Sequence, residues 1–281
     1  MSDPRVPPDA LRIGWFATGQ GTMSRALLDA AHAAIERGEL RARIPFLFCN
    51  REPGEHENSD ALLATAARYG IPTLTLSDLR FRRRVGGEVA RAGQPLPAWR
   101  TDYDRAVMDL IAPFGMDLGM LAGYMLIFAP EMCARHDFLN LHPAVPGGPI
   151  GTWQRVIWQL INASAAESGV LVNRVIPEVD EGPVVAFCRY PLRGPEFDPL
   201  WSAIAGRRAD DLREREGEDL PLFRAIRAAG VAREIPLIVQ TLVALADRRV
   251  RLVDGVPWGE SAPLPGGLDL TPEVEAAVRS G

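Results

Sequence analysis

Residues 138–143 read Phe138-Leu139-Asn140-Leu141-His142-Pro143, and the organisation of the chain can be worked out from this stretch. In an extended strand, residues two apart share a face, so Asn140 and His142 are expected on one face and the two leucines on the other. Proline ends the strand because it cannot donate to the hydrogen-bond ladder of a sheet. The stretch therefore predicts an amide and a titratable imidazole at the carboxyl end of a strand, where open α/β sheets bind ligands.

A carboxylate is expected to join this pair from further along the chain. Asp180 stands just before Gly182-Pro183, which is a turn signal, and between apolar runs at 169–176 and 183–188. Each residue alone has an ordinary structural interpretation, as a strand-end cap, a satisfied core histidine or a turn residue. The ordered pattern of Asn-x-His-Pro, a helix, a strand and Asp-x-Gly-Pro favours one shared site.

The amino-terminal part of the chain predicts an anion-binding turn. Residues 11–17 are an apolar run typical of a buried strand, a Thr-Gly-Gln-Gly turn at 18–21 breaks it, and helical spacing follows at 23–35. Backbone N–H groups at such a helix start attract an anion without a charged side chain, although a purely structural turn is the other interpretation. A dinucleotide site is disfavoured, because the loop lacks a third glycine and the second strand, 44–50, ends in Asn50 rather than an acid.

Hydrophobic spacing predicts the remaining elements. They are helices at 58–70, at 100–114 and after Trp153, strands at 71–76 and 116–122, two helical patterns within 219–247 separated by Gly230, a strand and turn at 249–258, and a short helix at 272–279. Strands that alternate with helices are typical of α/β proteins. We expect one domain over residues 1–281, with a loose arm at 1–10.

The composition excludes several classes of protein. The chain has 281 residues, a formal net charge of −5 and no lysine, so that all 31 basic residues are arginine. The absence of lysine excludes Schiff-base enzymes and P-loop nucleotide hydrolases. The negative net charge disfavours a nucleic-acid partner, because phosphate binding needs a basic face.

Cysteine and histidine patterns favour a cytoplasmic protein without a metal. Cys49, Cys133 and Cys188 are far apart and lie in or beside apolar runs, so we expect reduced core thiols. The four histidines show no metal-ligand spacing. The start, Met-Ser-Asp-Pro, does not resemble a signal peptide, and we find no apolar run of roughly 20 residues, so we expect no membrane partner.

Taken together, these stretches form a pattern that resembles the folate-dependent formyltransferases, and most closely the phosphoribosylglycinamide formyltransferases. Leu121–Met125 is similar to a strand end of that family, Arg100–Asp104 to the start of the preceding helix, Gly19–Thr22 to the substrate loop, and 236–258 to the last helix and strand. The resemblance covers nearly the whole chain, with apparent insertions at 80–98 and 195–230 and a peripheral tail at 259–281. It implies an α/β fold with a Rossmann-like, open, mostly parallel twisted sheet and helices on both faces.

The resemblance also implies an activity, which is formyl transfer from 10-formyltetrahydrofolate, used as a cosubstrate, to the primary amine of a small molecule such as glycinamide ribonucleotide. Asn140 and protonated His142 would stabilise the oxyanion of the tetrahedral centre, and Asp180 would accept the proton of the amine. The implied substrate-binding residues are Gly19, Gln20, Gly21, Thr22 and Arg100, and the implied folate-binding residues are Tyr124, Met125, Leu126, Ile127, Val179 and Glu181.

Departures from the family pattern leave the acceptor open. Asn173 and Trp153 stand where the ribonucleotide enzymes have histidines, Leu126 where arginine is common, and Val231-Ala232 where a glutamate–histidine pair is expected. Two other functions also stay open. A formyltetrahydrofolate hydrolase would use water in place of the amine, and a non-catalytic folate-binding or regulatory protein is disfavoured by the intact catalytic residues. A homodimer is the one protein partner left open.

Overall fold

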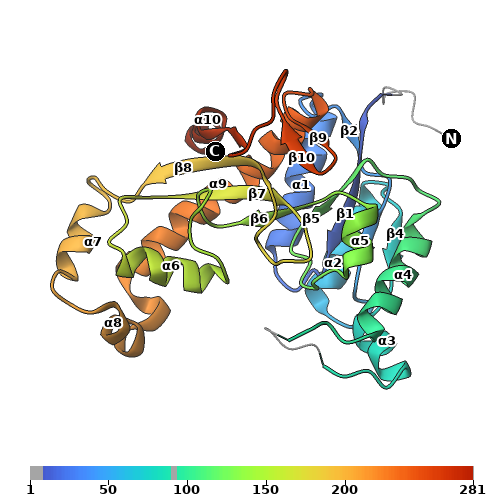
Figure 1. Cartoon of the computed structure of the whole chain (residues 1–281), viewed down its shortest axis with the longest axis horizontal. Coiled ribbons are helices and arrows are strands. Elements are labelled where there is room, and N and C mark those ends of the chain that lie inside the picture. The colour runs from blue at the N-terminus through green and yellow to red at the C-terminus, as the bar shows by residue number, and fades with distance from the viewer. Residues whose placement is uncertain (1–8, 90–93, 281) are drawn as a thin grey trace.

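One twisted sheet runs through the protein (Figure 1). The structure, a computed structural model, describes residues 9–89 and 94–280. Within these residues the sheet has nine strands, in the order β11-β8-β7-β6-β5-β1-β3-β4 with β2 paired to β1. Most neighbouring strands are parallel and helices cover both faces. The predicted fold class, an open and mostly parallel α/β sheet, is therefore confirmed.

The first half of the sheet is parallel and contains the point where the strand order reverses. Its strands are β1 (Leu11–Ala17), β2 (Ala42–Arg43), β3 (Leu47–Cys49), β4 (Thr73–Thr75), β5 (Leu118–Leu121) and β6 (Phe138–His142). From β1 the chain builds β3 and β4 on one side and then β5 and β6 on the other. Such a reversal leaves a crevice at the carboxyl ends of the central strands.

The second half of the sheet is mixed. β7 (Glu167–Arg174) and β8 (Val184–Pro191) continue the sheet antiparallel to β6, and β11 (Leu268–Asp269) pairs in parallel with β8. The loop between β7 and β8 starts beside the first residue of β6, where Val175 donates to the carbonyl of Phe138. From there it folds back over β6, because Asp180 contacts side chains further along that strand.

Alternating side chains divide the interior into two cores, one on each face of the sheet. In β1, Ile13, Trp15 and Ala17 belong to the larger core, whereas Phe16 belongs to a smaller aromatic core. The larger core is covered by α1 (Met23–Glu36), α2 (Glu57–Arg68), α6 (Trp153–Asn162), α9 (Pro221–Ala246) and α10 (Thr271–Ser280). The aromatic core is covered by α3 (Asp78–Arg84), α4 (Trp99–Ile111) and α5 (Pro130–Arg135).

Two expected elements differ from the structure. The helical patterns on either side of Gly230 form one continuous helix, α9. Gly230 does not end the helix but allows close packing, since a Cβ there would lie 3.2 Å from the Tyr190 hydroxyl. The strand expected at 249–258 is a hairpin of β9 (Arg251–Val253) and β10 (Val256–Trp258) in a small sheet of its own. Its turn residues, Asp254 and Gly255, both have positive φ, which is the geometry of a tight hairpin.

Of the two segments interpreted as insertions, 195–230 is largely helical, whereas the described part of 80–98 is helical only at its start. Residues 80–98 include most of α3, and 90–93 lie outside the described residues. Residues 195–230 form α7 (Asp198–Ala203), α8 (Ala209–Arg215), the short 3₁₀ helix η1 (Gly217–Asp219) and the first turns of α9. The tail supplies β11 and α10, and so belongs to the folded edge of the sheet. Of the loose arm expected at 1–10, residues 1–8 are not described.

Within the described residues, α9 is the one helix long and apolar enough to cross a membrane by length and composition. The sequence expectation that no apolar run reaches roughly 20 residues is therefore corrected at α9. Half of the apolar stretch of α9 is buried inside the protein, where α9 packs against α1, α6, β7 and β8. This environment is typical of the central helix of a folded core.

Candidate active site

β6 presents Asn140 and His142 from one face. Leu139 and Leu141 pack the opposite way, into the larger core, as the spacing predicted. Backbone hydrogen bonds join β6 to β5 on one side and to β7 on the other, so both polar side chains start from a rigid strand. The side chain of His142 is 6% exposed, and a polar group buried to this degree needs hydrogen-bond partners.

Asp180 reaches this face from the β7–β8 loop through an unusual backbone. Its φ is 61°, in the left-handed region that residues other than glycine seldom adopt. Two residues later, a Cβ on Gly182 would overlap the carbonyl oxygen of Arg174, so glycine is required there. Backbone strain of this kind concentrates at functional sites. The turn seen in the sequence therefore delivers the carboxylate.

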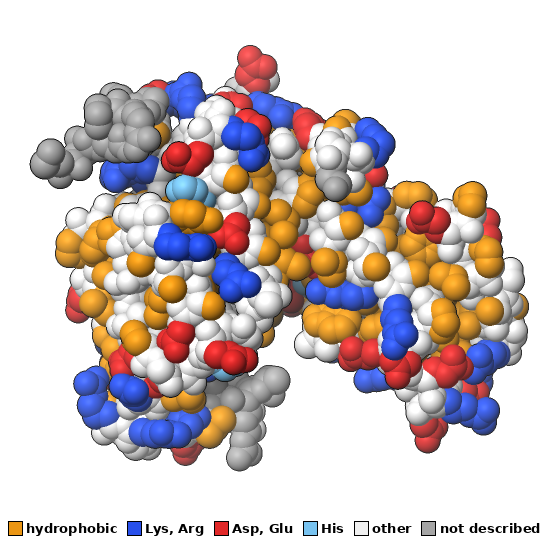
Figure 2. All heavy atoms as spheres, turned by 180° about the vertical axis from the view of Figure 1, so that it is seen from behind, with side chains coloured by type: hydrophobic (Ala, Val, Ile, Leu, Met, Phe, Trp, Pro, Cys, Tyr) orange, Lys and Arg blue, Asp and Glu red, His pale blue; other side chains and the backbone are white. Residues whose placement is uncertain are grey.

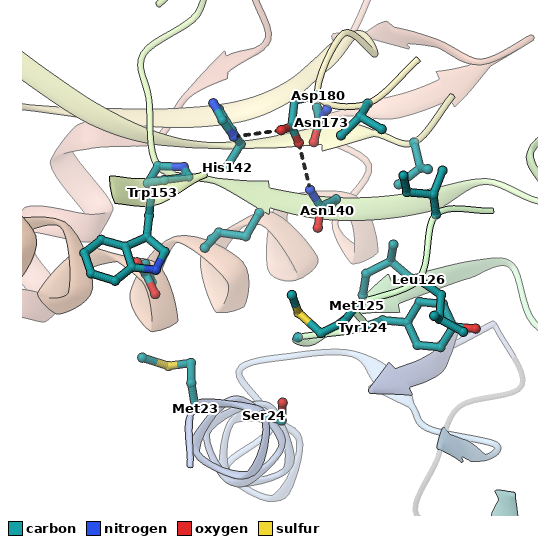
Figure 3. Close-up of a pocket in the computed structure, with 18 of the residues that line it drawn as sticks. Met23, Ser24, Tyr124, Met125, Leu126, Asn140, His142, Trp153, Asn173 and Asp180 are labelled. Atoms are coloured by element: carbon teal, nitrogen blue, oxygen red, sulfur yellow. Dashed lines mark hydrogen bonds and ion pairs between the residues drawn. The ribbon is translucent and has the colours of Figure 1, made fainter. Parts of the chain in front are cut away.

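The carboxylate lies between the two side chains of β6 (Figure 3). Asn140 Nδ2 donates to Asp180 Oδ1 at 3.4 Å, and His142 Nδ1 lies 3.5 Å from Asp180 Oδ2. Both distances exceed the roughly 2.7–2.9 Å of a tight charge-assisted hydrogen bond. Each carboxylate oxygen makes one of these contacts and has a second lone pair that can accept a further proton. The structure thus brings together the three residues that the sequence analysis assigned to one site.

The second ring nitrogen of His142 is occupied by the loop after β6. Nε2 lies 2.9 Å from the carbonyl oxygen of Pro149. Because a carbonyl can only accept, Nε2 carries a proton and donates it, which leaves Nδ1 directed at Asp180. Gly147 and Gly151 have φ values of 73° and 119°, conformations that suit glycine and let the loop curl over the ring.

A cavity of about 640 Å³ opens beside these three residues, a size that suits a small-molecule ligand. The expected site residues that line it are Asn140, His142, Asp180, Gln20, Gly21, Tyr124, Met125, Leu126, Ile127 and Val179. In Figure 3, Tyr124, Met125 and Leu126 lie on one side of the three polar residues and Trp153 on the other. On the whole molecule, Figure 2 shows a hollow between the part that carries α3 and α4 and the part that carries α6 to α8.

Four expected binding residues do not line the cavity, namely Gly19, Thr22, Glu181 and Arg100. Gly19 shapes the loop, because its φ is 69° and a Cβ there would lie 3.0 Å from the backbone of Ser59. Thr22 occupies the position before α1 and makes no side-chain capping bond. Glu181 follows Asp180 in the chain but is exposed and does not line the cavity.

Arg100 requires a correction. It was expected to face the substrates, but it is 1% exposed and does not line the cavity. Its guanidinium donates to the carbonyl of Ile127 at 2.8 Å and to Asp104 at 3.2 Å, while Asp104 accepts from the backbone N–H of Ala129 at 2.6 Å. The pair of Arg100 and Asp104 therefore holds the backbone at Ile127 and Ala129 in place, next to the residues 124–128 that line the cavity. A buried charge needs a charged partner, and the sequence did not show that α4 points this arginine inward.

Several residues of the cavity were not expected as site residues. They are Met23 and Ser24 from the first turn of α1, Trp153 and Asn173, which had been noted only as departures from the family pattern, and Arg227 and Glu234 from α9. Arg227 Nη1 lies 2.5 Å from Glu234 Oε1. The two residues are seven apart in the chain and therefore lie on one face of the helix. That spacing was a visible signal, but the sequence did not show which face of α9 meets the site.

Other reactive groups of the chain lie away from this cavity. Cys49, Cys133 and Cys188 are buried, and burial raises the pKa of these thiols to about 11, 11 and 12. Thiols of such high pKa are weak nucleophiles at neutral pH. Across residues 9–89 and 94–280, no cluster of three histidine, cysteine, aspartate or glutamate side chains is arranged to hold a metal.

A family model described as formyl transferase matches residues 11–192. The chain belongs to the formyl transferase family. The matched span contains Asn140, His142 and Asp180 together with the glycine turn, whereas α7 to α10 lie beyond it. The resemblance seen in the sequence is therefore confirmed, and the protein is a formyl-transferring enzyme.

This formyl transferase is similar to curated enzymes named phosphoribosylglycinamide formyltransferase. The enzyme of Escherichia coli is 25% identical over 260 residues, which cover 91% of this chain and 96% of the relative. That of Haemophilus influenzae is 27% identical over 186 residues, which cover 64% of this chain and 73% of the relative.

Solved structures share the fold of this formyl transferase. The phosphoribosylglycinamide formyltransferase of Coxiella burnetii superposes with a TM-score of 0.64 at 20% identity, covering 92% of this chain and 99% of that one. A formyltetrahydrofolate deformylase of Burkholderia mallei gives 0.53 at 18% identity, covering 88% of this chain and 69% of that one. Enzymes named for two different activities thus share this architecture, so the fold alone does not distinguish between these activities.

Proposed function

We propose that this formyl transferase moves a formyl group from 10-formyltetrahydrofolate to the primary amine of a small molecule. The observation that carries the proposal is the carboxylate of Asp180, which lies between the amide of Asn140 and the imidazole of His142 at the wall of a ligand-sized cavity. Attack by an amine on a formyl carbon needs a donor for the developing oxyanion and an acceptor for the ammonium proton. This arrangement supplies both.

The transfer forms one bond and breaks one. The amine nitrogen attacks the formyl carbon, the bond from that carbon to N10 of the folate breaks, and one proton passes in net terms from the amine to N10. The products are a formamide and tetrahydrofolate. Asp180 is the proton acceptor, since it keeps free lone pairs while it contacts both neighbours.

Asn140 and His142 stabilise the oxyanion in different ways. One N–H of the Asn140 amide is directed at Asp180, which leaves the second for the oxyanion. The ring nitrogens of His142 are directed at Pro149 and Asp180, so in this arrangement protonated His142 acts by placing positive charge nearby. In comparable acyl chemistry, loss of one such donor costs about 10²–10³-fold in rate.

We assign the folate to the side of the cavity formed by Tyr124–Ile127 and Val179. Met125 and Val179 are 68% and 50% exposed, although both are apolar. Exposed apolar side chains at the rim of a cavity are typical of a ligand-binding wall, and a flat heteroaromatic ring suits such a wall.

Glycinamide ribonucleotide is the first acceptor to test, because the relatives are named for it. Gln20 and Gly21 line the cavity just before α1, where backbone N–H groups suit a phosphate. Leu126, Asn173 and Trp153 also line it, in place of the charged or titratable residues expected from the resemblance. The acceptor panel should therefore include amines without phosphate.

The proposal is tested by incubating the protein with 10-formyltetrahydrofolate, first alone and then with each amine. Tetrahydrofolate is followed by absorbance and the formamide by mass spectrometry. We expect tetrahydrofolate to form only when an amine is present, in equal amount with the formamide. Release of formate without an amine would identify a hydrolase instead, and folate binding without any turnover would identify a binding protein.

A further inference from the structure

A second cavity adjoins the first and shares two of its side chains. It has a volume of about 470 Å³ and lies between α9, η1 and the start of α6. Trp153 and Arg227 line both cavities. The two cavities are therefore neighbours, and the side chains of this pair form part of the wall of each.

Aromatic rings and small side chains give the second cavity its apolar character. The ring of Phe223 lies 5.9 Å from that of Trp153 and 5.2 Å from that of Trp158, centroid to centroid. Ala228 and Ala232 are one helical turn apart on α9, are exposed, and line the cavity. Because alanine projects little beyond the helix backbone, the space above them stays open beside an aromatic floor.

The two arginines that line this cavity already have partners. Arg227 is paired with Glu234, and its guanidinium lies 4.7 Å from the centre of the Trp153 ring. Arg224 is paired with Asp219. The guanidinium of Arg227, which is both ion-paired and stacked on the indole, offers a flat surface whose charge is balanced by Glu234. The second cavity is thus better suited to an apolar or aromatic group than to an anion.

The position of the second cavity connects it to the amine rather than to the folate. Trp153 lies across Asn140, His142 and Asp180 from Tyr124 and Leu126 (Figure 3). With the folate on the Tyr124 side, the amine approaches these polar residues from the Trp153 side. The part of the acceptor beyond its amine then points toward the second cavity.

We propose that the second cavity is the distal part of the acceptor site, and that the acceptor is a primary amine carrying an apolar or aromatic group. The direction of approach rests on the proposed function. Val231 and Ala232, which stand where the resemblance led us to expect a glutamate–histidine pair, both line this cavity. The expected polar pair is therefore replaced by apolar side chains at the cavity where the apolar group of the acceptor would bind.

Two amines with the same attacking group test the proposal, namely glycinamide and glycine benzylamide. Burial of the phenyl ring should raise kcat/KM for the benzylamide by about 10- to 100-fold, mainly through KM. Equal kcat/KM values for the two amines would overturn the inference.

Filling the cavity provides the matched comparison. Ala232→Trp should reduce the preference for the benzylamide over glycinamide to about threefold or less. Ala228→Trp is the second variant in case the first does not fold. Ala67→Trp, at an exposed alanine of α2 outside both cavities, is the control and should keep the full preference. A folded Ala232→Trp or Ala228→Trp protein that keeps the preference would contradict the proposal.

Equilibrium binding of the two amides, measured by calorimetry, separates this inference from the proposed function. Tighter binding of the benzylamide that Ala232→Trp abolishes supports the subsite, even if no formyl group is transferred and the proposed function fails. Formyl transfer to both amines without any difference in binding overturns the subsite and leaves the proposed function standing. Absence of both binding and transfer overturns both.

Discussion

At Asp180, an unusual backbone conformation and a proposed chemical role meet in one residue. The φ of 61° is tolerated by aspartate and asparagine better than by most residues, because their short polar side chains bond locally. Replacement by asparagine therefore keeps the backbone and the volume of the side chain. It removes only the charge and the capacity to accept the proton.

We predict that Asp180→Asn lowers kcat for formyl transfer by about 10²–10⁴-fold with little change in Tm, because general-base contributions are of this size. Steady-state kinetics and thermal unfolding measure the two effects. Asp109→Asn, at an exposed position of α4, is the control and should match wild type. Undiminished turnover of Asp180→Asn would remove the carboxylate from the mechanism.

Among the carboxylates of residues 9–89 and 94–280, Asp104 is the one whose pKa the structure clearly raises toward neutral pH. Burial raises its pKa from 3.8 to about 6, against the lowering effects of Arg100 and of the Ala129 N–H. Because the folded pKa exceeds the unfolded one, the folded chain binds a proton that the unfolded chain releases between about pH 4 and 6. The corresponding stability is fully present below pH 4 and is lost as the pH rises through 6.

We predict that Asp104→Asn removes this titration. Relative to wild type, its free energy of unfolding should rise by on the order of 2–3 kcal/mol between pH 4 and pH 7.5. Loss of the partner of Arg100 destabilises the variant by an amount that does not vary over this range, so the difference in slope isolates Asp104. Urea unfolding at several pH values measures it, and parallel profiles for the two proteins would contradict the prediction.

Among the elements, the β7–β8 connection positions the site most directly. It starts beside the first residue of β6 and returns over that strand. At its end, Gly182 lies so close to the carbonyl of Arg174 that only glycine fits. The strands on both sides were visible as apolar runs, and the turn as Gly-Pro. Its return over β6 was not visible, because it depends on the pairing of β6 with β7, residues that lie about thirty apart in the chain.

We predict that Gly182→Ala destabilises the protein by about 1–3 kcal/mol and lowers formyl transfer, because the added methyl group must displace the backbone next to Asp180. Thermal unfolding and kcat/KM measure the two effects. Gly266→Ala is the matched control, since its Cβ would meet no atom within 4 Å. Equal stability of the two variants would show that the loop has room to shift.

At the scale of the whole molecule, the last helix, α10, is part of the folded core at one edge of the sheet. α10 packs against α9 and β8, and Val274 is fully buried although it is seven residues from the end of the chain. Composition alone indicated a peripheral tail here, because the preceding residues are rich in glycine and proline. The burial arises from β11, which pairs with β8 and carries α10 onto the core.

We predict that Val274→Asp destabilises the protein by about 3 kcal/mol or more, because it places an unpaired carboxylate in the larger core. Ala276→Asp, two residues further along and exposed on the same helix, should have nearly wild-type stability. Denaturant unfolding compares the two. A small effect of Val274→Asp would mean that α10 detaches readily from the rest of the fold.

Local sequence patterns were sufficient to predict most helices and strands of this chain and the arrangement of the residues around Asn140. The reason is that strand alternation, helix spacing and turn chemistry act between residues only a few positions apart. The tertiary structure alone decided that Arg100 faces inward, that α9 brings Arg227 and Glu234 to the cavity, and that a second cavity lies beyond Trp153. These features depend on which face of each helix packs against the sheet. That choice is made by contacts between residues far apart in the chain, which periodicity does not encode.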